Sequence, residues 1–418
     1  MEELSGFVKA FISGKVDLVG LDIGSYAVKA AAVSVAGKSV KIKGWGYEAY
    51  NFKPNSSIEE KKAQMNAALR KMLSNARISN KSVCIGVSGN SVIVRYVKLP
   101  WMSRPELEMR LRAEAEPFIP FDINDVNLGF HKIADIKEDG AKKMEVILVA
   151  AKREIISAKM DVITAVGLNP LIIDVDVFAL DSLCNLLGGK SGGHGHSDPS
   201  AEKHASAVMV LNIGHKITSL AIIENGVTRV ARDIFIAGST FNKAIAKNLG
   251  IEVDRADELK KEFGLDMGSV EAVTEKTAAA QPSELAAGLL PSVTEFGMVG
   301  AAAPAAIQPQ SASQHAAISN IIHEVLKDLV VEVRRSVDFF YSQGSDRTIS
   351  RVYLCGGSAN LKNIEQFFAA ELNTPVEILN PFGISSEAPE MAPSEEIKPA
   401  MAVAMGLSLR EMWDWQRQ

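Results

Sequence analysis

Two segments of this chain carry the same pattern, and this repeat restricts the possible folds more than any other feature of the sequence. Residues 19–33 and 209–223 each combine two alternating apolar stretches with a central glycine turn, and Gly24 corresponds to Gly214 at an offset of 190 residues. Alternation of apolar residues with period two indicates β-strands. A repeated strand-turn-strand unit predicts two similar domains that face each other.

The rest of the chain alternates strand and helix patterns. It predicts a strand at 39–50, a helix at 59–76 and a strand at 82–89, and later a long helix at about 318–343 before a last strand and turn. We therefore predict an α/β fold with two duplicated domains and a small inserted α/β subdomain. The expected segments are a leader helix (1–16), the first domain (17–89), the inserted subdomain (90–172), the return of the first domain (173–187), a flexible loop (188–204), the second domain (205–266), a mobile Ala/Pro-rich insertion (267–317), the completion of the second domain (318–410) and a tail (411–418).

Composition excludes several classes of protein. A net charge of −5 argues against nucleic-acid binding, which requires a basic face. The three cysteines are isolated in the sequence, so neither a disulfide framework nor a zinc site is indicated. The sequence has no apolar run of about 18 residues and its start lacks a signal-peptide pattern, so we expect a cytoplasmic protein.

Three glycine turns follow predicted strands, at DIGS (22–25), NIGH (212–215) and CGGSANL (355–361). Glycine allows the backbone to approach a phosphate closely, and free N–H groups in a tight turn form an anion-binding concavity. Two such hairpins that face each other indicate a polyphosphate site. The third turn precedes a helix and suits a nucleoside or an α-phosphate.

Side chains around the first turn add metal and charge to this site. Asp22 ends a predicted strand, where a carboxylate can hold hydrated Mg²⁺ through water. Ser25 can donate its hydroxyl to a phosphate, and Lys29 can neutralise phosphate charge if its face of the strand points into the cleft.

These residues resemble the actin-like ATPase superfamily, which includes actin, the Hsp70 chaperones, sugar kinases and FtsA. Within it, the sequence is most similar to the PilM family of type IV pilus assembly proteins. The similarity extends over almost the whole chain apart from two loops, and it implies an actin-like fold that closes over a nucleotide. It rests on VGLDIGSYAVKAAAVS (19–34), EAEPFIPFDINDVNLGFHKI (114–133), EVILVAAKREII (145–156), GLNPLIIDVDVFAL (167–180), EVRRSVDFFYSQ (332–343) and PAMAVAMGLSLR (399–410).

The resemblance implies ATP or ADP with Mg²⁺ as cofactors and assigns roles to residues. Metal contacts are implied for Asp22 and, through water, for Asn212. Asp176 falls where filament-forming relatives orient the attacking water, and Asp174 on the same strand is a competitor; for either, a carboxylate satisfied at a strand end is an equal alternative. Nucleotide contacts are implied for Gly24, Ser25, Lys29, Gly214, Thr218, Gly238, Ser239, Asp257, Lys260, Gly356, Gly357 and Ser358.

Asn212 departs from the pattern of many relatives, which have a carboxylate at this position. Because most phosphate affinity comes from backbone amides and Asp22, we expect nucleotide binding to survive. Hydrolysis depends more finely on the placement of metal and water, where small displacements cost about a hundredfold. The sequence therefore predicts at most a weak ATPase activity.

The resemblance implies an adaptor at the cytoplasmic face of the inner membrane that binds the N-terminal tail of the membrane protein PilN. The expected groove lies between the inserted subdomain and the first domain, and further contacts are implied with pilus motor ATPases, other platform proteins and other copies of the chain. Two alternatives stay open: an FtsA-like filament-forming protein, and a phosphotransferase of the sugar-kinase branch.

Overall fold

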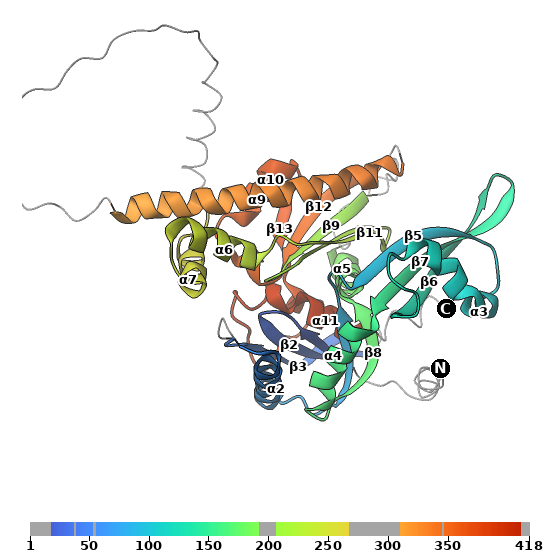
Figure 1. Cartoon of the computed structure of the whole chain (residues 1–418), viewed down its shortest axis with the longest axis horizontal. Coiled ribbons are helices and arrows are strands. Elements are labelled where there is room, and N and C mark those ends of the chain that lie inside the picture. The colour runs from blue at the N-terminus through green and yellow to red at the C-terminus, as the bar shows by residue number, and fades with distance from the viewer. Residues whose placement is uncertain are drawn as a thin grey trace, which may run out of the picture.

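The computed structural model describes residues 18–36, 39–52, 56–191, 206–266, 310–344 and 347–410. This part contains two five-stranded sheets with equivalent strand order and one three-stranded sheet (Figure 1). The first sheet has the order β3-β2-β1-β4-β8 and the second β11-β10-β9-β12-β13. In both, three antiparallel strands are followed by two that join in parallel. The duplication predicted from the repeat is confirmed.

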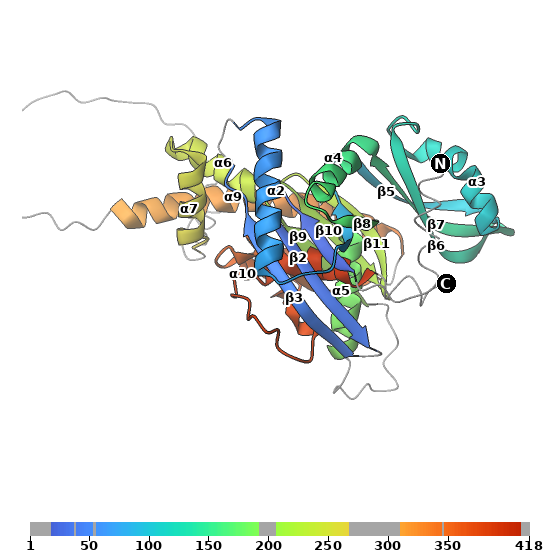
Figure 2. The ribbon, with the colours of Figure 1, turned by 90° about the horizontal axis from the view of Figure 1, so that it is seen from below.

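The first domain is built from strands with a helix on the outer face of the sheet. Ser57 begins α2 with a capping box, in which its hydroxyl accepts the Glu60 N–H and the Glu60 carboxylate accepts the Ser57 N–H. The helix packs on β2 and β3 (Figure 2). The elements are β1 (Val19–Ile23), β2 (Ala27–Ala36), β3 (Ser39–Ala49), α2 (Ile58–Asn75), β4 (Ser82–Val87), α4 (Arg153–Thr164), β8 (Asn169–Val175) and α5 (Asp176–Ser191).

The second domain repeats this plan, with helices α6, α7 and α9 packed together on its outer side. Its elements are β9 (Ser206–Ile213), β10 (Thr218–Glu224), β11 (Val227–Ile234), α6 (Gly238–Leu249), α7 (Val253–Phe263), α9 (Gln310–Ser342), β12 (Thr348–Cys355), the 3-10 helix η2 (Gly357–Asn360), α10 (Ile364–Leu372) and β13 (Val376–Ile378).

Two helices fill the space between the two sheets. The last described helix, α11 (Ala402–Ser408), packs against α5 and β1 (Figure 1). One continuous apolar core includes α5, α11, Ala31 of the first sheet and Val210 of the second. Both sheets are therefore held to a shared centre, and their hairpin turns project from it.

The inserted subdomain has its own core and lies to one side of the two sheets (Figures 1 and 2). It consists of β5 (Val92–Pro100), α3 (Arg104–Ala115), β6 (Val126–Glu138) and β7 (Ala141–Lys152), with strand order β5-β7-β6. Leu107 of α3 packs in its core with Met144 and Leu148 of β7.

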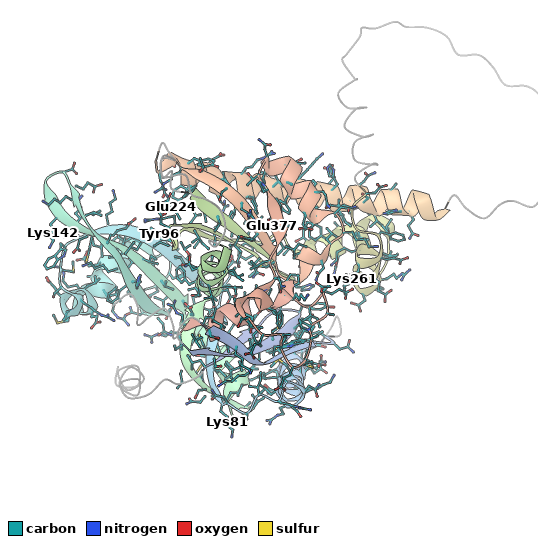
Figure 3. The ribbon with its side chains drawn as sticks, turned by 180° about the vertical axis from the view of Figure 1, so that it is seen from behind. Lys81, Tyr96, Lys142, Glu224, Lys261 and Glu377 are labelled. Atoms are coloured by element: carbon teal, nitrogen blue, oxygen red, sulfur yellow. The ribbon has the colours of Figure 1, made fainter. Side chains whose placement is uncertain are left out.

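An ionic contact joins this subdomain to the second domain. The Arg229 guanidinium of β11 lies 3.2 Å from the Glu145 carboxylate of β7 and 3.5 Å from the Glu224 carboxylate of β10. Figure 3 marks Glu224 and Tyr96 on the two sides of this junction. Burial raises the pKa of Tyr96 above its usual range, so its hydroxyl stays protonated.

Several expected boundaries differ from the structure. The sequence predicts residues 153–172 as part of the inserted subdomain, but Val162 and Ile163 of α4 pack in the core of the first domain and β8 pairs with β4. The apolar pattern of these segments predicts that α4 and β8 are buried, but it does not predict against which sheet they pack. The long helix α9 begins at Gln310, inside the segment expected to be mobile. The leader helix (1–16), the tail (411–418) and most of both expected loops lie outside the described residues.

Within the described ranges, every helix is too short or too polar to cross a membrane.

Candidate functional site

The first hairpin turn brings together Gly24, Asp22 and Lys29. The Gly24 N–H donates to the Ala27 carbonyl at 3.1 Å and closes the turn. Asp22 and Lys29 are opposite each other in the β1–β2 register, and the Lys29 ammonium lies 2.6 Å from the Asp22 carboxylate. A Cβ on Gly24 would lie 3.1 Å from the Lys29 ammonium. The side chain of Lys29 therefore points to the turn, where it would face an anion bound there.

The tip of this turn keeps donors available. Ser25 is exposed, and in the described part of the chain the N–H groups of Ser25 and Tyr26 donate to no backbone carbonyl. Free N–H groups beside an ammonium form a suitable surface for an anion.

The second turn has the same closure and more support behind it. The Gly214 N–H donates to the Ile217 carbonyl at 3.0 Å, as Gly24 does to Ala27. The Gly214 carbonyl accepts the Gly238 N–H at 3.0 Å and the Ser358 hydroxyl at 3.0 Å. The structure thus brings together three predicted segments: the second turn, the start of α6 and the third turn.

Ser239 and Thr218 hold the loops around the second turn. The Ser239 N–H donates to the His215 carbonyl at 2.6 Å. Thr218 was expected to contact the nucleotide, but it is fully buried and its hydroxyl donates to the Ile236 carbonyl at 2.7 Å. Because Thr218 starts a buried strand, its hydroxyl positions the β11–α6 loop and has no exposed surface for a ligand.

The third turn depends on Gly356, which has a φ of 86°. A Cβ there would lie 2.5 Å from the Ile213 carbonyl oxygen and 2.6 Å from the side-chain oxygen of Asn212. Gly357, the next residue, has open space around it. The Asn212 amide is therefore directed at the third turn, a placement that the pattern in the sequence did not predict.

Asp176 lies at the start of α5 in a buried polar cluster. Its Oδ2 accepts the Ser88 hydroxyl at 2.7 Å, and among the described residues its buried Oδ1 has no hydrogen-bond partner. A Cβ on Gly86 would lie 1.9 Å from this Oδ1, so only glycine leaves room for the carboxylate. The Lys159 ammonium donates to the Gly86 carbonyl at 2.6 Å and lies close enough to affect Asp176.

The electrostatics of this cluster mark Asp176 as unusual. Burial raises the pKa of the Asp176 carboxyl to about 6, with Asp22 adding to the rise and the Lys159 ammonium opposing it. The influence of Asp22 places the two carboxylates in one electrostatic environment. Carboxyl groups with a raised pKa near a cleft are frequent at functional sites.

Asp174 is occupied elsewhere. Its Oδ1 accepts the N–H of Val175 at 2.8 Å, and its Oδ2 lies 3.0 Å from the Arg410 guanidinium. Asp174 is therefore a carboxylate satisfied at a strand end, whereas Oδ1 of Asp176 has no hydrogen-bond partner among the described residues.

Asp257 and Lys260 form a buried network with Asn242 beneath α6 and α7. The Lys260 ammonium donates to the Asn242 side-chain oxygen at 2.6 Å and to the Asp257 carboxylate at 2.7 Å. Burial would raise the pKa of Asp257, but its contacts with Lys260 and Lys261 hold it well below its usual range. This network fixes the helix pair, with Lys261 exposed at its edge (Figure 3).

The site residues predicted from the sequence do not include Ser88, Lys159, Asn242, Tyr26 and His215. Ser88 lies just before Gly89 near the end of the predicted strand 82–89, so it had a detectable signal: Asp22 and Asn212 were also predicted from strand ends beside glycine turns. Lys159 and Asn242 lie on helices, where one polar residue among many gives no signal.

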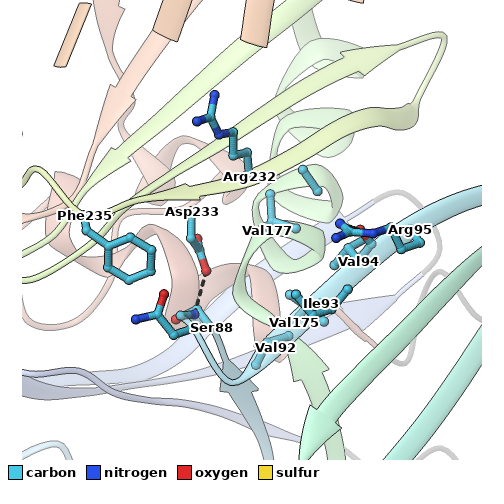
Figure 4. Close-up of a pocket in the computed structure, with 13 residues that line it drawn as sticks. Ser88, Val92, Ile93, Val94, Arg95, Val175, Val177, Arg232, Asp233 and Phe235 are labelled. Atoms are coloured by element: carbon cyan, nitrogen blue, oxygen red, sulfur yellow. Dashed lines mark hydrogen bonds between the residues drawn. The ribbon is translucent and has the colours of Figure 1, made fainter. Parts of the chain in front are cut away.

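A groove of about 230 Å³ lies where β5, β11 and the start of α5 meet (Figure 4). Val92 and Val94 of the subdomain line it together with Val175 and Val177, which flank Asp176. Asp233 joins the two domains beside the groove, because its carboxylate accepts the Gly89 N–H at 2.6 Å. The lining residues are Ser88, Gly89, Asn90, Val92, Ile93, Val94, Arg95, Val175, Val177, Ala231, Arg232, Asp233 and Phe235.

Comparison with known proteins agrees with this architecture. The family described as type IV pilus assembly protein PilM matches residues 20–276 and 293–412. A solved PilM-PilN type IV pilus biogenesis complex contains a chain that is 25% identical, with a TM-score of 0.69, over 95% of this chain and 99% of that one.

Two further solved structures are more distant. The ethanolamine utilization protein EutJ from Carboxydothermus hydrogenoformans is 12% identical with a TM-score of 0.47, over 98% of this chain and 97% of that one. MreB 5 of Spiroplasma citri, bound to AMPPNP, is 14% identical with a TM-score of 0.45, over 97% of this chain and 98% of that one.

The family match and the paired five-stranded sheets confirm the predicted actin-like fold. They also favour the pilus assembly family over the filament-forming and sugar-kinase alternatives. The chain belongs to the PilM family of type IV pilus assembly proteins.

Proposed function

We propose that this protein is a nucleotide-holding adaptor of the type IV pilus assembly platform, which captures the N-terminal cytoplasmic tail of PilN and hydrolyses ATP slowly or not at all. The observation that carries the nucleotide part is the pair of equivalent hairpin turns, closed by the same hydrogen bond at Gly24 and Gly214, with the third turn bonded to the second through Ser358. The similarity to a chain of a PilM-PilN complex supports the partner.

ATP or ADP would lie between the two hairpins. Ser25 and Lys29 would face the phosphates from the first domain, and the turn at Gly214 would face them from the second. The third turn, with Gly356, Gly357 and Ser358, and the Asp257–Lys260 pair would flank the nucleoside. Backbone donors and an ammonium supply most phosphate affinity at such sites.

The residues fit a hydrated Mg²⁺ ion. The described residues contain no group of three or more potential metal-binding side chains, but Mg²⁺ commonly needs only one or two carboxylates besides phosphate oxygens and water. Asp22, at the first turn, would supply one of them. Bound there, Mg²⁺ would neutralise phosphate charge, and Lys29 would share that task.

We propose that Asp176 orients water and that turnover is slow because Asn212 contributes no charge. Asn212 is directed at Gly356 and its amide is neutral, so the second hairpin has no carboxylate for the metal at this position. ATP turnover by the purified protein should stay below about 1 s⁻¹, the lower edge of ordinary enzyme rates. A faster rate that Asp176→Asn abolishes would contradict this part of the proposal.

For the PilN tail, we propose the groove lined by β5 and the start of α5. Its walls are mainly apolar, and an extended segment beside an edge strand can bind by main-chain hydrogen bonds with pockets for alternate side chains. A second hollow, beside Phe121 and Arg153, is lined mostly by charged residues and offers fewer apolar contacts for side chains of an extended peptide.

Calorimetry tests both parts of the proposal. The full chain is titrated with ATP and Mg²⁺, and then with a peptide that copies the first residues of PilN. Val94→Asp in the groove should weaken peptide binding at least tenfold and leave ATP binding intact, whereas Arg153→Asp in the second hollow should leave both intact. Loss of peptide binding in Arg153→Asp alone would move the partner site, and failure of the wild type to bind ATP would refute the nucleotide part.

A further inference from the structure

The two hairpin turns touch each other through their side chains. Tyr26 of the first turn and His215 of the second have ring centroids 5.3 Å apart and an interplanar angle of 47°. Lys261 of α7 also reaches Tyr26, with its ammonium 3.3 Å from the tyrosine oxygen and 5.5 Å from the ring centroid. Three side chains thus connect the first domain to two elements of the second, directly beside the candidate phosphate site.

The backbone of each of these two residues is fixed by a hydrogen bond within its own domain. The Tyr26 carbonyl accepts the Tyr50 N–H at 2.9 Å, at the end of β3. The His215 carbonyl accepts the Ser239 N–H at 2.6 Å, at the start of α6. A movement that separates the two domains would therefore have to separate the two rings.

Charge around the rings favours the contact. Lys261 is held by an ion pair with Asp257, whose other oxygen contacts Lys260 and Asn242. Burial lowers the pKa of His215 to about 4, with Lys260 adding to the effect, so the ring is neutral at physiological pH. A neutral ring near Lys260 avoids a repulsion that a protonated ring would introduce.

Tyr26 is partly exposed, and the ring contacts it makes are with the other domain. The side chain is 38% exposed, and it lies at the tip of the β1–β2 hairpin. Its ring contacts are with His215 and Lys261, both in the opposite domain. The Tyr26 ring therefore links the first domain to the second.

We propose that Tyr26, His215 and Lys261 form a clasp across the nucleotide cleft, and that its opening limits how fast nucleotide enters and leaves. Tyr26 and His215 are positioning residues, because their contact sets the spacing of the two phosphate turns. This inference rests on the proposed nucleotide binding. In this proposal the clasp is the reason why a bound nucleotide, which is rarely hydrolysed, also dissociates slowly.

Release of a fluorescent ADP analogue, measured by stopped flow after mixing with excess ADP, tests the clasp. Tyr26→Ala removes all three contacts and should release the analogue about tenfold faster, as expected from an aromatic pair and an exposed cation–π contact. Tyr26→Phe keeps the ring and should stay within about threefold of the wild type. Tyr341→Ala is the matched control, because Tyr341 is 41% exposed and lies on α9 away from the turns, and its release rate should not change.

A second measurement needs no nucleotide. Spin labels at Asn75→Cys on α2 and Lys247→Cys on α6 report the separation of the two domains, since both positions are exposed and the three native cysteines are buried. Tyr26→Ala should give a longer or broader distance distribution than the wild type, and Tyr26→Phe should restore the narrow one.

The outcomes separate the two proposals. A wild type that binds no nucleotide refutes the proposed function, and the distance measurement then still decides whether the clasp holds the domains together. Wild-type release rates and distances in Tyr26→Ala would overturn the clasp while leaving nucleotide binding in place.

Discussion

The two hairpin turns share a backbone but differ in charge. In the β1–β2 register Asp22 is opposite Lys29, and in the β9–β10 register the equivalent residues are Asn212 and Ser219. The first pair is an ion pair of 2.6 Å, with both side chains largely buried. The second pair is neutral: Asn212 faces Gly356, and the Ser219 hydroxyl donates to the Asp233 carboxylate at 2.7 Å.

This difference separates two tasks within a duplicated fold. The second turn is braced by the start of α6 and by the third turn, which together hold the Gly214 carbonyl. The first turn instead shares an electrostatic environment with Asp176 and Lys159. One half therefore supplies a rigid support, and the other supplies the charges that any metal or phosphate chemistry requires.

The largest effect is expected where the support is tightest. Gly356→Ala should destabilise the protein by about 3 kcal/mol or more, because it combines a backbone conformation open only to glycine with a clash against the β9 end. Gly357→Ala is the matched control, since it meets open space, and it should change the free energy of unfolding by less than about 1 kcal/mol. Chemical denaturation measures both. Equal values for the two variants would mean that the third turn does not brace the second.

The sequence predicts those parts of the fold that depend on local patterns, and it does not predict those that depend on tertiary packing. The hairpins at Gly24 and Gly214 are local, with alternating strands and a glycine turn, so the repeat revealed both. The placement of α4 was wrong because an amphipathic helix does not record which of two sheets it will cover. Packing of Val162 and Ile163 in the first domain is a tertiary choice.

The site was readable only in its strand-end residues. Gly24, Asp22 and Lys29 could be placed together because strand pairing fixes their register. The orientation of the Asn212 side chain, by contrast, depends on its close contact with Gly356. Gly356 follows a strand more than a hundred residues later in the sequence, so no local pattern predicts this contact. Tyr26 and His215 meet across two domains, and no pattern within either hairpin contains that contact.

The second prediction exchanges the charge between the turns. Asp22→Asn should abolish the gain in ATP affinity that Mg²⁺ provides, lowering affinity at saturating Mg²⁺ by about a hundredfold, because a charged contact contributes roughly 1.5 to 3 kcal/mol. Asn212→Asp places a carboxylate at the equivalent position and should raise ATP turnover while changing affinity less than about fivefold. Calorimetry with and without Mg²⁺, and a phosphate-release assay, measure the pair. An Mg²⁺ effect that persists in Asp22→Asn would show that the first turn does not hold the metal.

The third prediction uses the pH dependence of the first half. The Asp176 carboxyl titrates near 3.8 when unfolded and at about 6 when folded, so the folded protein binds the extra proton between these values. Ionised Asp176 therefore costs stability above about pH 6, and the cost disappears below about pH 4. In metal-free and nucleotide-free protein, Asp176→Asn should be more stable than the wild type by about 2 kcal/mol near pH 8, with the difference vanishing near pH 4.

Asp174→Asn is the matched variant for this test. It breaks the ion pair with Arg410 and should destabilise the protein near neutral pH, the opposite sign from Asp176→Asn. Denaturation at a series of pH values distinguishes them. The same sign for both substitutions would contradict the different roles assigned to these two aspartates.

The smallest effect is expected in the second turn and has the opposite pH slope. His215 titrates near 6.5 when unfolded and at about 4 when folded, so the unfolded chain binds the extra proton and stability falls as the pH drops through this interval. His215→Gln removes that loss, although it also removes the ring contact with Tyr26. The stability difference between variant and wild type should therefore shift by about 1 kcal/mol in favour of the variant between about pH 7.5 and pH 5, a value reduced because the side chain is partly in water. In the wild type, the gain from Asp176 and the loss from His215 oppose each other over the same interval, so only the single variants expose them. If the free energy of unfolding had the same pH dependence in His215→Gln and the wild type, His215 would ionise as easily in the folded protein as in the unfolded chain. The second turn would then not be kept neutral, and the difference in charge between the two turns would be smaller than their side chains indicate.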